Sequence, residues 1–271
     1  MEINKKIGFI GSGNMAQAII KGLLSKNIIK PENIIASDPD EKKLQKLCEE
    51  KRIKTTKNNL EVIENAEIII LAIKPNVFKQ VLQEIKGLIR EDQILVSIAA
   101  GISIDFIKNH IKNEKIKIVR VMPNMPALVG EGMSAICCNQ NLSEEELIYI
   151  KDIFDSIGKS EFIDEKYMDS VTAISGSSPA YVYLFIEALA DGGVLLGLPR
   201  DIAYRLASQA VLGAAKMVLE TNMHPGVLKD FVCSPGGTTI EAIKVFEKNG
   251  FRGIVMDAMV ACYEKAKKLS N

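Results

Sequence analysis

The sequence of 271 residues contains no tryptophan, few aromatic residues and no net charge. Lys and Arg number 34 and Asp and Glu number 34, so the formal charges cancel. Proteins that bind nucleic acids or membrane surfaces normally carry a basic excess, so we expect neither kind of partner. Apolar residues make up 47% and charged residues 25% of the chain, which is typical of a folded globular protein and excludes a disordered one.

Cysteine and histidine are also scarce. The five cysteines are odd in number and show no CxxC spacing, which argues against a disulfide framework and favours a reducing compartment. Neither His110 nor His224 stands in a zinc-ligand pattern, so we expect no metal site.

Targeting and membrane segments are not expected either. The residues from Met1 to Lys6 lead directly into a strand-like run, without the pattern of a signal peptide. The longest apolar stretch, around Tyr181 to Leu198, is interrupted by Glu187 and Asp191 and is no membrane span. We therefore expect a cytoplasmic location.

The first part of the chain alternates between short apolar runs and segments with helical spacing. Strands are predicted over residues 6–10, 33–36, 67–73, 93–98, 116–122, 133–137 and 159–163. Helices are predicted over residues 14–24, 41–51, 76–85, 104–111 and 143–157. Continuous Ile/Val runs are typical of parallel strands covered on both faces. The repeated units therefore predict an α/β fold with a doubly wound, mostly parallel sheet.

The pattern changes near Asp164. From there on every periodic segment has helical spacing, over residues 167–175, 179–196, 200–221, 226–232, 239–248 and 251–269. We therefore predict two domains, 1–163 and 164–271, the second all-α. The helix that starts at Pro179 is apolar on nearly all sides, so it must be buried on every side. A helical domain of this size covers it only partly, and we expect a partner subunit to complete the core.

A glycine-rich turn follows the first strand and opens the first helix, with the GxGxxA pattern from Gly11 to Ala16. Gly11 permits the tight turn, Gly13 lets the backbone approach a pyrophosphate, and Ala16 allows close packing of helix on strand. The amides near Asn14 and Met15 then face the phosphates. This context predicts a dinucleotide-binding domain over residues 1–163. The alternative is a tight strand–helix turn without a ligand.

The end of the second predicted strand should contact the adenosine ribose. An acid such as Asp38 usually bonds the ribose hydroxyls and repels a 2′-phosphate, which favours NADH. Two observations keep NADPH open: Ser37 can help to hold a phosphate, and Lys42 and Lys43 lie near. Asp38 can also simply begin the turn before Pro39.

Two further loops follow strands of the predicted sheet, where ligands bind in open α/β folds. One spans Ala72 to Pro75, and we interpret Lys74 as a cofactor contact rather than a proton donor. The other spans Ile98 to Gly101, whose small residues suit a nicotinamide ribose. The predicted cofactor contacts of these segments are Ile10, Gly11, Ser12, Gly13, Asn14, Met15, Ser37, Asp38, Ala72, Ile73, Lys74, Pro75, Ala99 and Ala100.

Two motifs place small residues and hydroxyls before predicted helices of the second domain. One runs from Ser175 to Tyr181 and includes Ser177; the other runs from Ser234 to Thr239. Gly236, Gly237, Thr238 and Thr239 give consecutive amides and hydroxyls, an arrangement that suits a carboxylate. Helix capping is the alternative, although capping alone does not need two glycines and two threonines.

These motifs together resemble the Δ1-pyrroline-5-carboxylate reductases, and the resemblance covers nearly the whole chain. It rests on the segments 8–16, 72–75, 97–101, 120–124, 169–172, 175–181, 190–193, 213–216, 224–226, 228–230 and 234–239. The last segment is the most specific. Ser178, where many relatives have glycine, and Phe231, where some have a polar residue, depart from the pattern.

The resemblance implies NADPH- or NADH-dependent reduction of the C=N bond of pyrroline-5-carboxylate to L-proline, the final step of proline biosynthesis. It also implies a homodimer through the helical domain, with higher assembly possible. By the same resemblance, Asn58 contacts the adenosine end of the cofactor, Thr239 and the backbone of residues 236–238 hold the substrate, and Glu165 is a further substrate contact. We expect the Thr239 hydroxyl to hydrogen-bond the ring nitrogen, which makes it the candidate catalytic residue.

Three other functions were weighed. A β-hydroxyacid dehydrogenase shares the two-domain plan, but Lys216 is the lysine on offer and Gly192-Gly193 is not followed by one at the needed position. A reductase of another cyclic imine would not need the anion site at Gly236–Thr239. A nucleotide sensor without catalysis would not need the substrate motifs. The adjacent Cys137 and Cys138 fit a strand better than a redox switch.

Overall fold

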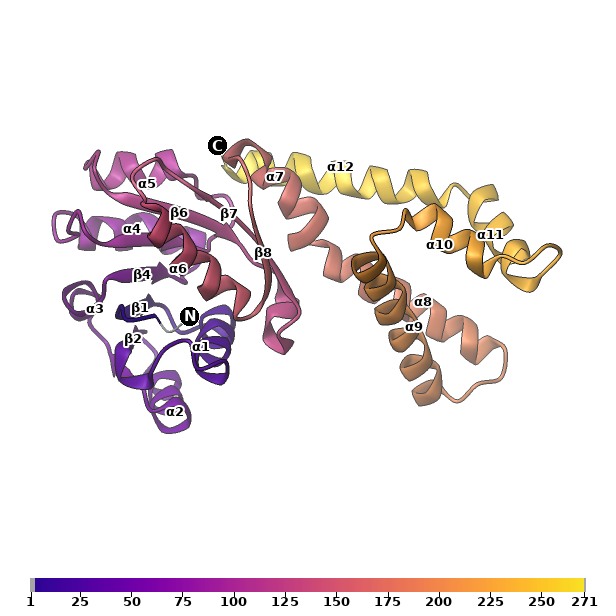
Figure 1. Ribbon diagram of the computed structural model, residues 1–271, viewed down its shortest axis with the longest axis horizontal. Helices are drawn as coiled ribbons and strands as arrows, with labels where there is room; N and C mark the ends of the chain where they lie inside the picture. The colour runs from indigo at the N-terminus through magenta and orange to yellow at the C-terminus, as the bar shows by residue number, and fades with distance from the viewer. Residues whose placement is uncertain (1–2, 271) are drawn as a thin grey trace. The chain divides into compact units, whose positions relative to one another are not determined.

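The computed structural model describes residues 3–270 and divides into two compact units (Figure 1). Unit 1 holds the residues up to Ser177 and those from Cys262 onward, and unit 2 holds Ser178–Ala261. The predicted domain boundary at residues 163 and 164 stays a prediction. Helix α12 belongs to both units, because its last turns return to unit 1.

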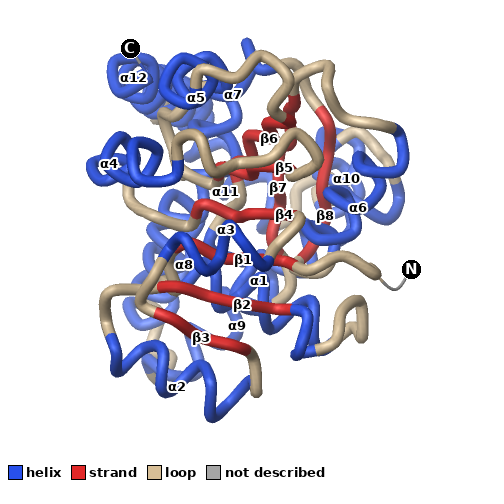
Figure 2. The backbone as a smooth tube through the Cα atoms, turned by 90° about the vertical axis from the view of Figure 1, so that its left-hand side faces the viewer, coloured by secondary structure: helices blue, strands red, loops and turns tan. Residues whose placement is uncertain are grey.

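Unit 1 is built on one sheet of eight strands in the order β3-β2-β1-β4-β5-β6-β7-β8 (Figure 2). The strands are β1 (Ile7–Ile10), β2 (Ile34–Ser37), β3 (Lys54–Thr56), β4 (Ile68–Leu71), β5 (Ile94–Ser97), β6 (Lys117–Met122), β7 (Gly132–Cys138) and β8 (Gly158–Phe162). All pairs are parallel except β6 with β7, which is antiparallel. The predicted α/β class with a mostly parallel, doubly wound sheet is confirmed.

Helices cover both faces of this sheet. The α-helices of unit 1 are α1 (Asn14–Ser25), α2 (Glu41–Lys51), α3 (Asn59–Asn65), α4 (Pro75–Ile85), α5 (Ile104–Ile111), α6 (Glu144–Asp155) and α7 (Met168–Val171). The short 3-10 helices are η1 (Pro31–Asn33), η2 (Met125–Val129) and η3 (Glu165–Tyr167), and η4 (Thr172–Gly176) is a π-helical turn.

The core of unit 1 forms two apolar layers, one on each face. Alternate strand residues such as Phe9 and Ile70 pack with α1 and α6, while their neighbours such as Ile69 and Leu71 pack with α3, α4 and α5. Because successive side chains of a strand point to opposite faces, a strand buried on both sides must be apolar throughout. This is why the Ile/Val runs identified the strands.

Every strand and helix predicted between residues 6 and 163 is present, with ends shifted by a few residues. Strand β3 and helix α3 were missed. β3 has three residues, Lys54, Thr55 and Thr56, none of which is buried, because it is an edge strand. An edge strand exposed on both faces does not show the apolar run on which the other predictions depended.

Unit 2 is entirely helical within its described residues. Its helices are α8 (Ser178–Leu195), α9 (Arg200–Thr221), α10 (Pro225–Val232), α11 (Thr238–Lys248) and the greater part of α12 (Phe251–Ser270). The prediction of helices without strands after Asp164 is confirmed for the part of the chain that the structure covers. None of the helices in residues 3–270 is long and apolar enough to cross a membrane.

Candidate functional site

The predicted cofactor loops of unit 1 lie side by side at the carboxyl edge of the sheet. The amide of Gly11 donates to the carbonyl of Ser37 over 2.8 Å, which joins the ends of β1 and β2. The amide of Ala72 donates to the carbonyl of Ile10, also over 2.8 Å, which joins β4 to β1. The Ile98 amide extends the series to β5 with a 3.4 Å bond to Leu71. The fold therefore gathers the loops after four strands, as the ligand site of an open α/β sheet requires.

The two glycines of the GxGxxA turn are explained by different features of the structure. Gly11 has a φ of +95°, and a Cβ there would lie 2.5 Å from the carbonyl oxygen of Ala72. The protein itself therefore requires glycine at this position. Gly13 has an ordinary φ of −66°, and a Cβ there would meet nothing within 4 Å. Neither backbone strain nor packing within unit 1 accounts for Gly13, whereas close approach by a ligand does.

Gly13 is also the N-cap of α1 and, as glycine, has no side chain with which to cap that helix. The first-turn amides near Asn14 and Met15 are therefore left to an external acceptor, and the helix dipole favours a negative one. A pyrophosphate carries both properties. These residues fit a dinucleotide, with its phosphates at the start of α1.

Asp38 is almost buried and holds the glycine-rich turn in place. Its Oδ2 accepts from the amide of Ser12 over 2.8 Å and from the Ser12 hydroxyl over 2.9 Å. Its Oδ1 accepts from the amide of Asp40 over 2.9 Å. Burial raises the pKa of the Asp38 carboxyl, but the hydrogen bonds from Asp40 and Ser12 outweigh burial and bring it below 3.8. Asp38 is therefore ionised at neutral pH beside the predicted ribose site.

Ser37 and Asn58, two further predicted cofactor contacts, make hydrogen bonds within unit 1. The Ser37 hydroxyl is fully buried and donates to Asn59 Oδ1 over 2.7 Å, and Asn59 in turn donates to Glu84 over 2.9 Å. The exposed Asn58 is the N-cap of α3, where its side chain accepts from the amide of Leu60 over 3.0 Å. The sequence analysis missed Asn59, because β3 and α3 were not recognised.

The two other loops present backbone and small side chains. Lys74 and Pro75 are exposed at the N-cap and the first residue of α4. Ala99 is buried and Ala100 is exposed, and Gly101 follows with a φ of +77°. A run of small residues fits the flat face of a sugar or a nicotinamide ring.

Glu165 lies at the start of η3 and is bonded within unit 1. Its Oε1 accepts from the amide of Ile104 over 2.9 Å and from Arg120 Nη1 over 3.0 Å. Arg120 is 6% exposed. Arg120 opens the segment 120–124, but no role could be predicted for it from the sequence, since only the fold brings β6 and η3 together.

Asn124 fixes the turn that carries Ser177. It donates through Nδ2 to the carbonyl and hydroxyl of Ser175, over 3.2 and 3.3 Å, and accepts from the amide of Met133. Ser177 follows the π-helical turn η4, and its hydroxyl accepts from the thiol of Cys262 over 3.3 Å. Single π-turns occur often at functional sites. The roles of Asn124 and Cys262 were also missed.

The motif Ser234–Thr239 lies in unit 2, between α10 and α11. The amide of Gly237 donates to the carbonyl of Ser234 over 3.0 Å, and Gly236 has a φ of +66°, as expected of a turn with Pro235 second and glycine third. Gly237 is the N-cap of α11 and makes no side-chain cap in the described structure. Thr238 and Thr239 are the first two residues of the helix and not its N-cap.

The thiols of β7 are poorly suited to redox chemistry. Burial raises the pKa of the Cys137 thiol to about 12, and the charge of Glu165 adds to this. Burial also raises the pKa of Cys138. The thiolate is the reactive form, so both side chains are unreactive near neutral pH. Among residues 3–270, no three His, Cys, Asp or Glu side chains gather as a metal site would require.

Comparison with known families defines the class of protein. Residues 6–101 match the family described as NADP oxidoreductase coenzyme F420-dependent, which covers the glycine-rich turn and the sheet loops up to Gly101. Residues 165–269 match the family described as pyrroline-5-carboxylate reductase dimerisation. With the fold above, these matches define an oxidoreductase that combines a dinucleotide-binding sheet with a helical dimerisation domain.

Full-length relatives specify the family. The chain is 47% identical over 268 residues to pyrroline-5-carboxylate reductase of Escherichia coli K12, covering 99% of each chain. A solved pyrroline-5-carboxylate reductase from Coxiella burnetii superposes with a TM-score of 0.93 at 34% identity, over 99% of this chain and 100% of that one. The Plasmodium falciparum pyrroline carboxylate reductase with NADP bound gives a TM-score of 0.89 at 39% identity, over 100% of both chains. The chain belongs to the pyrroline-5-carboxylate reductase family, and the resemblance drawn from its motifs is confirmed.

Proposed function

We propose that this chain reduces the C=N bond of Δ1-pyrroline-5-carboxylate to give L-proline, with NADH or NADPH as reductant. This reaction is the final step of proline biosynthesis. The geometric observation that carries the proposal is Gly13, a glycine that the protein does not need for its own backbone or packing. It opens the uncapped start of α1 to a dinucleotide. The family membership then selects pyrroline-5-carboxylate over the hydroxyacid and other imine substrates.

A nicotinamide bound to these residues would supply the hydride that reduces C5 of the imine ring. The predicted cofactor residues contact three parts of the dinucleotide. The amides at Gly13, Asn14 and Met15 face the pyrophosphate, and Asp38 and Asn58 face the adenosine. The loops 72–75 and 98–101 place backbone and small side chains against the nicotinamide ribose and ring.

The turn Ser234–Thr239 holds the substrate carboxylate. The first-turn amides of α11 are uncapped, and the positive end of the helix dipole favours an anion. Thr239 is the second residue of α11, so its hydroxyl has no capping task and bonds the ring nitrogen instead. Ser177 is a further contact to the substrate. A role of Glu165 in substrate binding stays a prediction.

Orientation provides most of the catalysis in this proposal. A pyrroline nitrogen is basic enough to be substantially protonated near neutral pH, and the protonated imine is a good electrophile. A strong protein acid is therefore not required. Holding two reactants in register can lower a barrier by roughly 7–11 kcal/mol. The carboxylate site and the cofactor loops provide that register.

The cofactor preference follows from Asp38, and we expect NADH to be favoured. The Asp38 carboxylate is ionised and is fixed by Ser12 beside the predicted ribose site. A ribose diol can donate hydrogen bonds to a carboxylate, whereas a 2′-phosphate is repelled by it. The nearest cation, Lys43, pairs with Asp40 over 3.5 Å and offsets this repulsion only in part.

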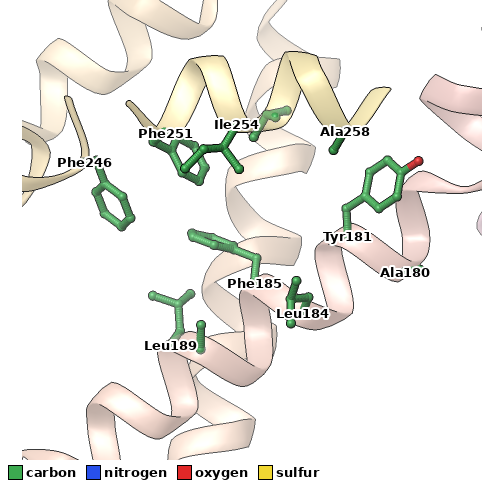
Figure 3. Close-up of a pocket in the computed structure, with 11 residues that line it drawn as sticks. Ala180, Tyr181, Leu184, Phe185, Leu189, Phe246, Phe251, Ile254 and Ala258 are labelled. Atoms are coloured by element: carbon green, nitrogen blue, oxygen red, sulfur yellow. The ribbon is translucent and has the colours of Figure 1, made fainter. Parts of the chain in front are cut away.

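The quaternary structure is a homodimer formed through the helical unit, with higher assembly possible. Helix α8 leaves large apolar side chains uncovered, among them Tyr183, Leu184 and Leu195. A groove of about 750 Å³ between α8, α11 and α12 is lined by apolar residues, including Phe185, Phe246 and Phe251 (Figure 3). A second copy of the helical unit covers such a surface without polar mismatch.

We place the enzyme in the cytoplasm.

The substrate proposal is tested by comparing pyrroline-5-carboxylate with 1-pyrroline, the same ring without the carboxylate. The loss of cofactor absorbance reports turnover with either substrate. We expect kcat/KM to fall by roughly one to two orders of magnitude for 1-pyrroline, since a charge-assisted contact contributes about 1.5–3 kcal/mol. Equal kcat/KM values for the two imines would exclude a carboxylate site at Gly236–Thr239.

A further inference from the structure

One carboxylate, that of Glu165, joins three segments of unit 1 that are far apart in the sequence. Its Oε1 accepts from the Ile104 amide over 2.9 Å and from the Arg120 guanidinium over 3.0 Å. The Arg120 side chain is 7% exposed and that of Glu165 is 33% exposed. A guanidinium so deeply buried requires a counter-charge, and Glu165 supplies it.

The two partners of Glu165 mark the two ends of the β5–α5 loop. Arg120 lies beside Ser97 in the parallel register of β5 and β6, and Ser97 is the last residue of β5. Ile104 is the first residue of α5. The ion pair therefore spans residues 98–103 and fixes the distance between the start and the end of the loop.

Ala99 and Ile102 anchor this loop in the apolar core, but its backbone hydrogen bonds are longer than those of Glu165. The amides of Ile98 and Ala99 donate bonds of 3.4 Å each, at the long limit for an amide donor. The α5 helix is already capped by Ser103, which accepts from the amide of Phe106 over 3.1 Å. Glu165 is therefore not needed to start α5, and its bond to Ile104 has its main effect on the loop that precedes the helix.

We propose that Glu165, held by Arg120, is a positioning residue that sets the loop 98–103 for cofactor binding. The inference rests on the proposed function in one respect, the contact of Ala99 and Ala100 with the nicotinamide half of the cofactor. It assigns Glu165 a task different from the substrate contact that the family resemblance implies. It also gives a role to Arg120.

The mechanism is a restriction of the backbone. Gly101, inside the loop, has a φ of +77°, and a Cβ there would lie 3.0 Å from the carbonyl oxygen of Leu269. The loop thus fits closely against the end of α12 on one side and is anchored by Glu165 at its exit. When the charge of Glu165 is removed, the anchor weakens and the loop has to be ordered by the cofactor itself, which lowers cofactor affinity.

The test uses Glu165→Gln in the full-length protein. Glutamine keeps an oxygen that can accept from Ile104 but loses the charge opposite Arg120. The dissociation constants of NADH and NADPH are measured by fluorescence titration without substrate, and amide hydrogen exchange is followed over residues 98–104. We expect cofactor Kd to rise about tenfold, amide exchange in the loop to become faster, and the KM for pyrroline-5-carboxylate to stay within about twofold.

Glu146→Gln is the matched control. Glu146, on α6, is a buried carboxylate that pairs with Lys117 over 2.7 Å. Lys117 lies on β6, as Arg120 does, but it is the first residue of that strand and lies away from the carboxyl-edge loops. This variant should lose comparable stability with cofactor Kd unchanged. Glu165→Asp, which keeps the charge, should fall between the wild type and Glu165→Gln. It serves as the second variant if the glutamine protein does not fold.

Two results would overturn the inference. A raised substrate KM with unchanged cofactor Kd would make Glu165 a substrate contact. Cofactor Kd values and loop exchange equal to those of Glu146→Gln would show that Glu165 and Arg120 form an ion pair with a structural role only. Because the titration needs no substrate, absence of turnover by the wild type would reject the proposed reaction and leave this comparison intact.

Discussion

At the scale of single residues, Gly11 and Gly13 show why one motif contains two kinds of information. Gly11 is explained by a positive φ and by its closeness to Ala72, both internal to the fold. Gly13 is explained by neither, so its missing Cβ points to something outside the chain. The structural role predicted for Gly11 agrees with this geometry, whereas the contact of Gly13 with a dinucleotide stays a prediction.

Gly13→Ala and Gly11→Ala form a matched pair. We expect Gly13→Ala to fold, with the free energy of unfolding changed by less than about 1 kcal/mol, since its φ is allowed and its Cβ is free of contact. Its Kd for the cofactor should rise about tenfold. Gly11→Ala should lose about 1–3 kcal/mol of stability through strain. Calorimetry and cofactor titration measure both effects, and unimpaired cofactor binding by Gly13→Ala would remove the basis for the phosphate site.

Thr239 offers a test of the catalytic assignment. We expect Thr239→Ala to lower kcat about ten- to a hundredfold, the loss of one hydrogen bond to the protonated ring nitrogen, with little change in cofactor Kd. Thr239→Ser keeps the hydroxyl and should restore most of kcat. Because Gly237 and not Thr239 is the N-cap of α11, stability should change little. Steady-state kinetics identical to the wild type for Thr239→Ala would exclude the hydroxyl from the reaction.

Asp38 links stability to pH. Its pKa in the folded chain is below its ordinary value of 3.8, because hydrogen bonds from Asp40 and Ser12 outweigh the effect of burial. The ionised form therefore stabilises the fold at pH values above 3.8, and this contribution is lost as the pH falls through the folded-state pKa. We expect the difference in unfolding free energy between wild type and Asp38→Asn to be constant near neutral pH and to shrink below 3.8. Urea titrations at several pH values measure it, and a difference that grows with acid would contradict the assignment.

At the scale of elements, predictability depended on burial. The strands buried on both faces could be predicted because they are apolar runs. The helices Asn14–Ser25 and Arg200–Thr221 could be predicted from their helical spacing. The edge strand β3 has no buried residue, so the search for apolar runs did not detect it. Its loss also hid Asn59 and the position of Asn58 as the cap of α3.

The turn before α11 illustrates a partial success. Two glycines were interpreted as evidence for an anion site, yet Gly236 is fully explained by the type of turn, whose third residue needs a positive φ. What the turn does not explain is the uncapped start of α11. The anion site at Gly236–Thr239 stays a prediction, and the amides at the start of α11 now support it better than the two glycines do.

Long-range polar contacts could not be predicted. Glu165 is 45 residues from Arg120 and 61 from Ile104, and nothing local in the sequence pairs them. The same holds for Asn124, whose partner Ser175 is 51 residues away. Such contacts follow from strand order, which the periodicity of single segments does not determine.

At the scale of the whole molecule, the amphipathic rule for helices is inverted in unit 2. Leu184 on α8 is 67% exposed, and Leu195 at its end is 88% exposed. Monomeric proteins rarely leave an apolar surface of this extent in water. The match of residues 165–269 to a dimerisation family supports the proposal that a second copy covers this surface.

Leu184→Glu tests that interface. In a two-fold dimer each substitution occurs twice, and burying one leucine contributes about 1.5–3 kcal/mol. We expect the wild type to be a dimer or larger by light scattering and Leu184→Glu to dissociate at micromolar concentration. Ile148→Glu, a change of the same kind at a half-exposed position of α6 in unit 1, is the control and should leave the assembly intact. A dimeric Leu184→Glu protein would place the interface elsewhere.

The most direct measurement is steady-state oxidation of NADH and of NADPH by the purified protein with pyrroline-5-carboxylate, with the product identified by chromatography. The account predicts turnover with L-proline as product and a higher kcat/KM with NADH than with NADPH. A preference for NADPH would contradict the role given to Asp38. Binding of the cofactor without formation of proline would contradict the central claim.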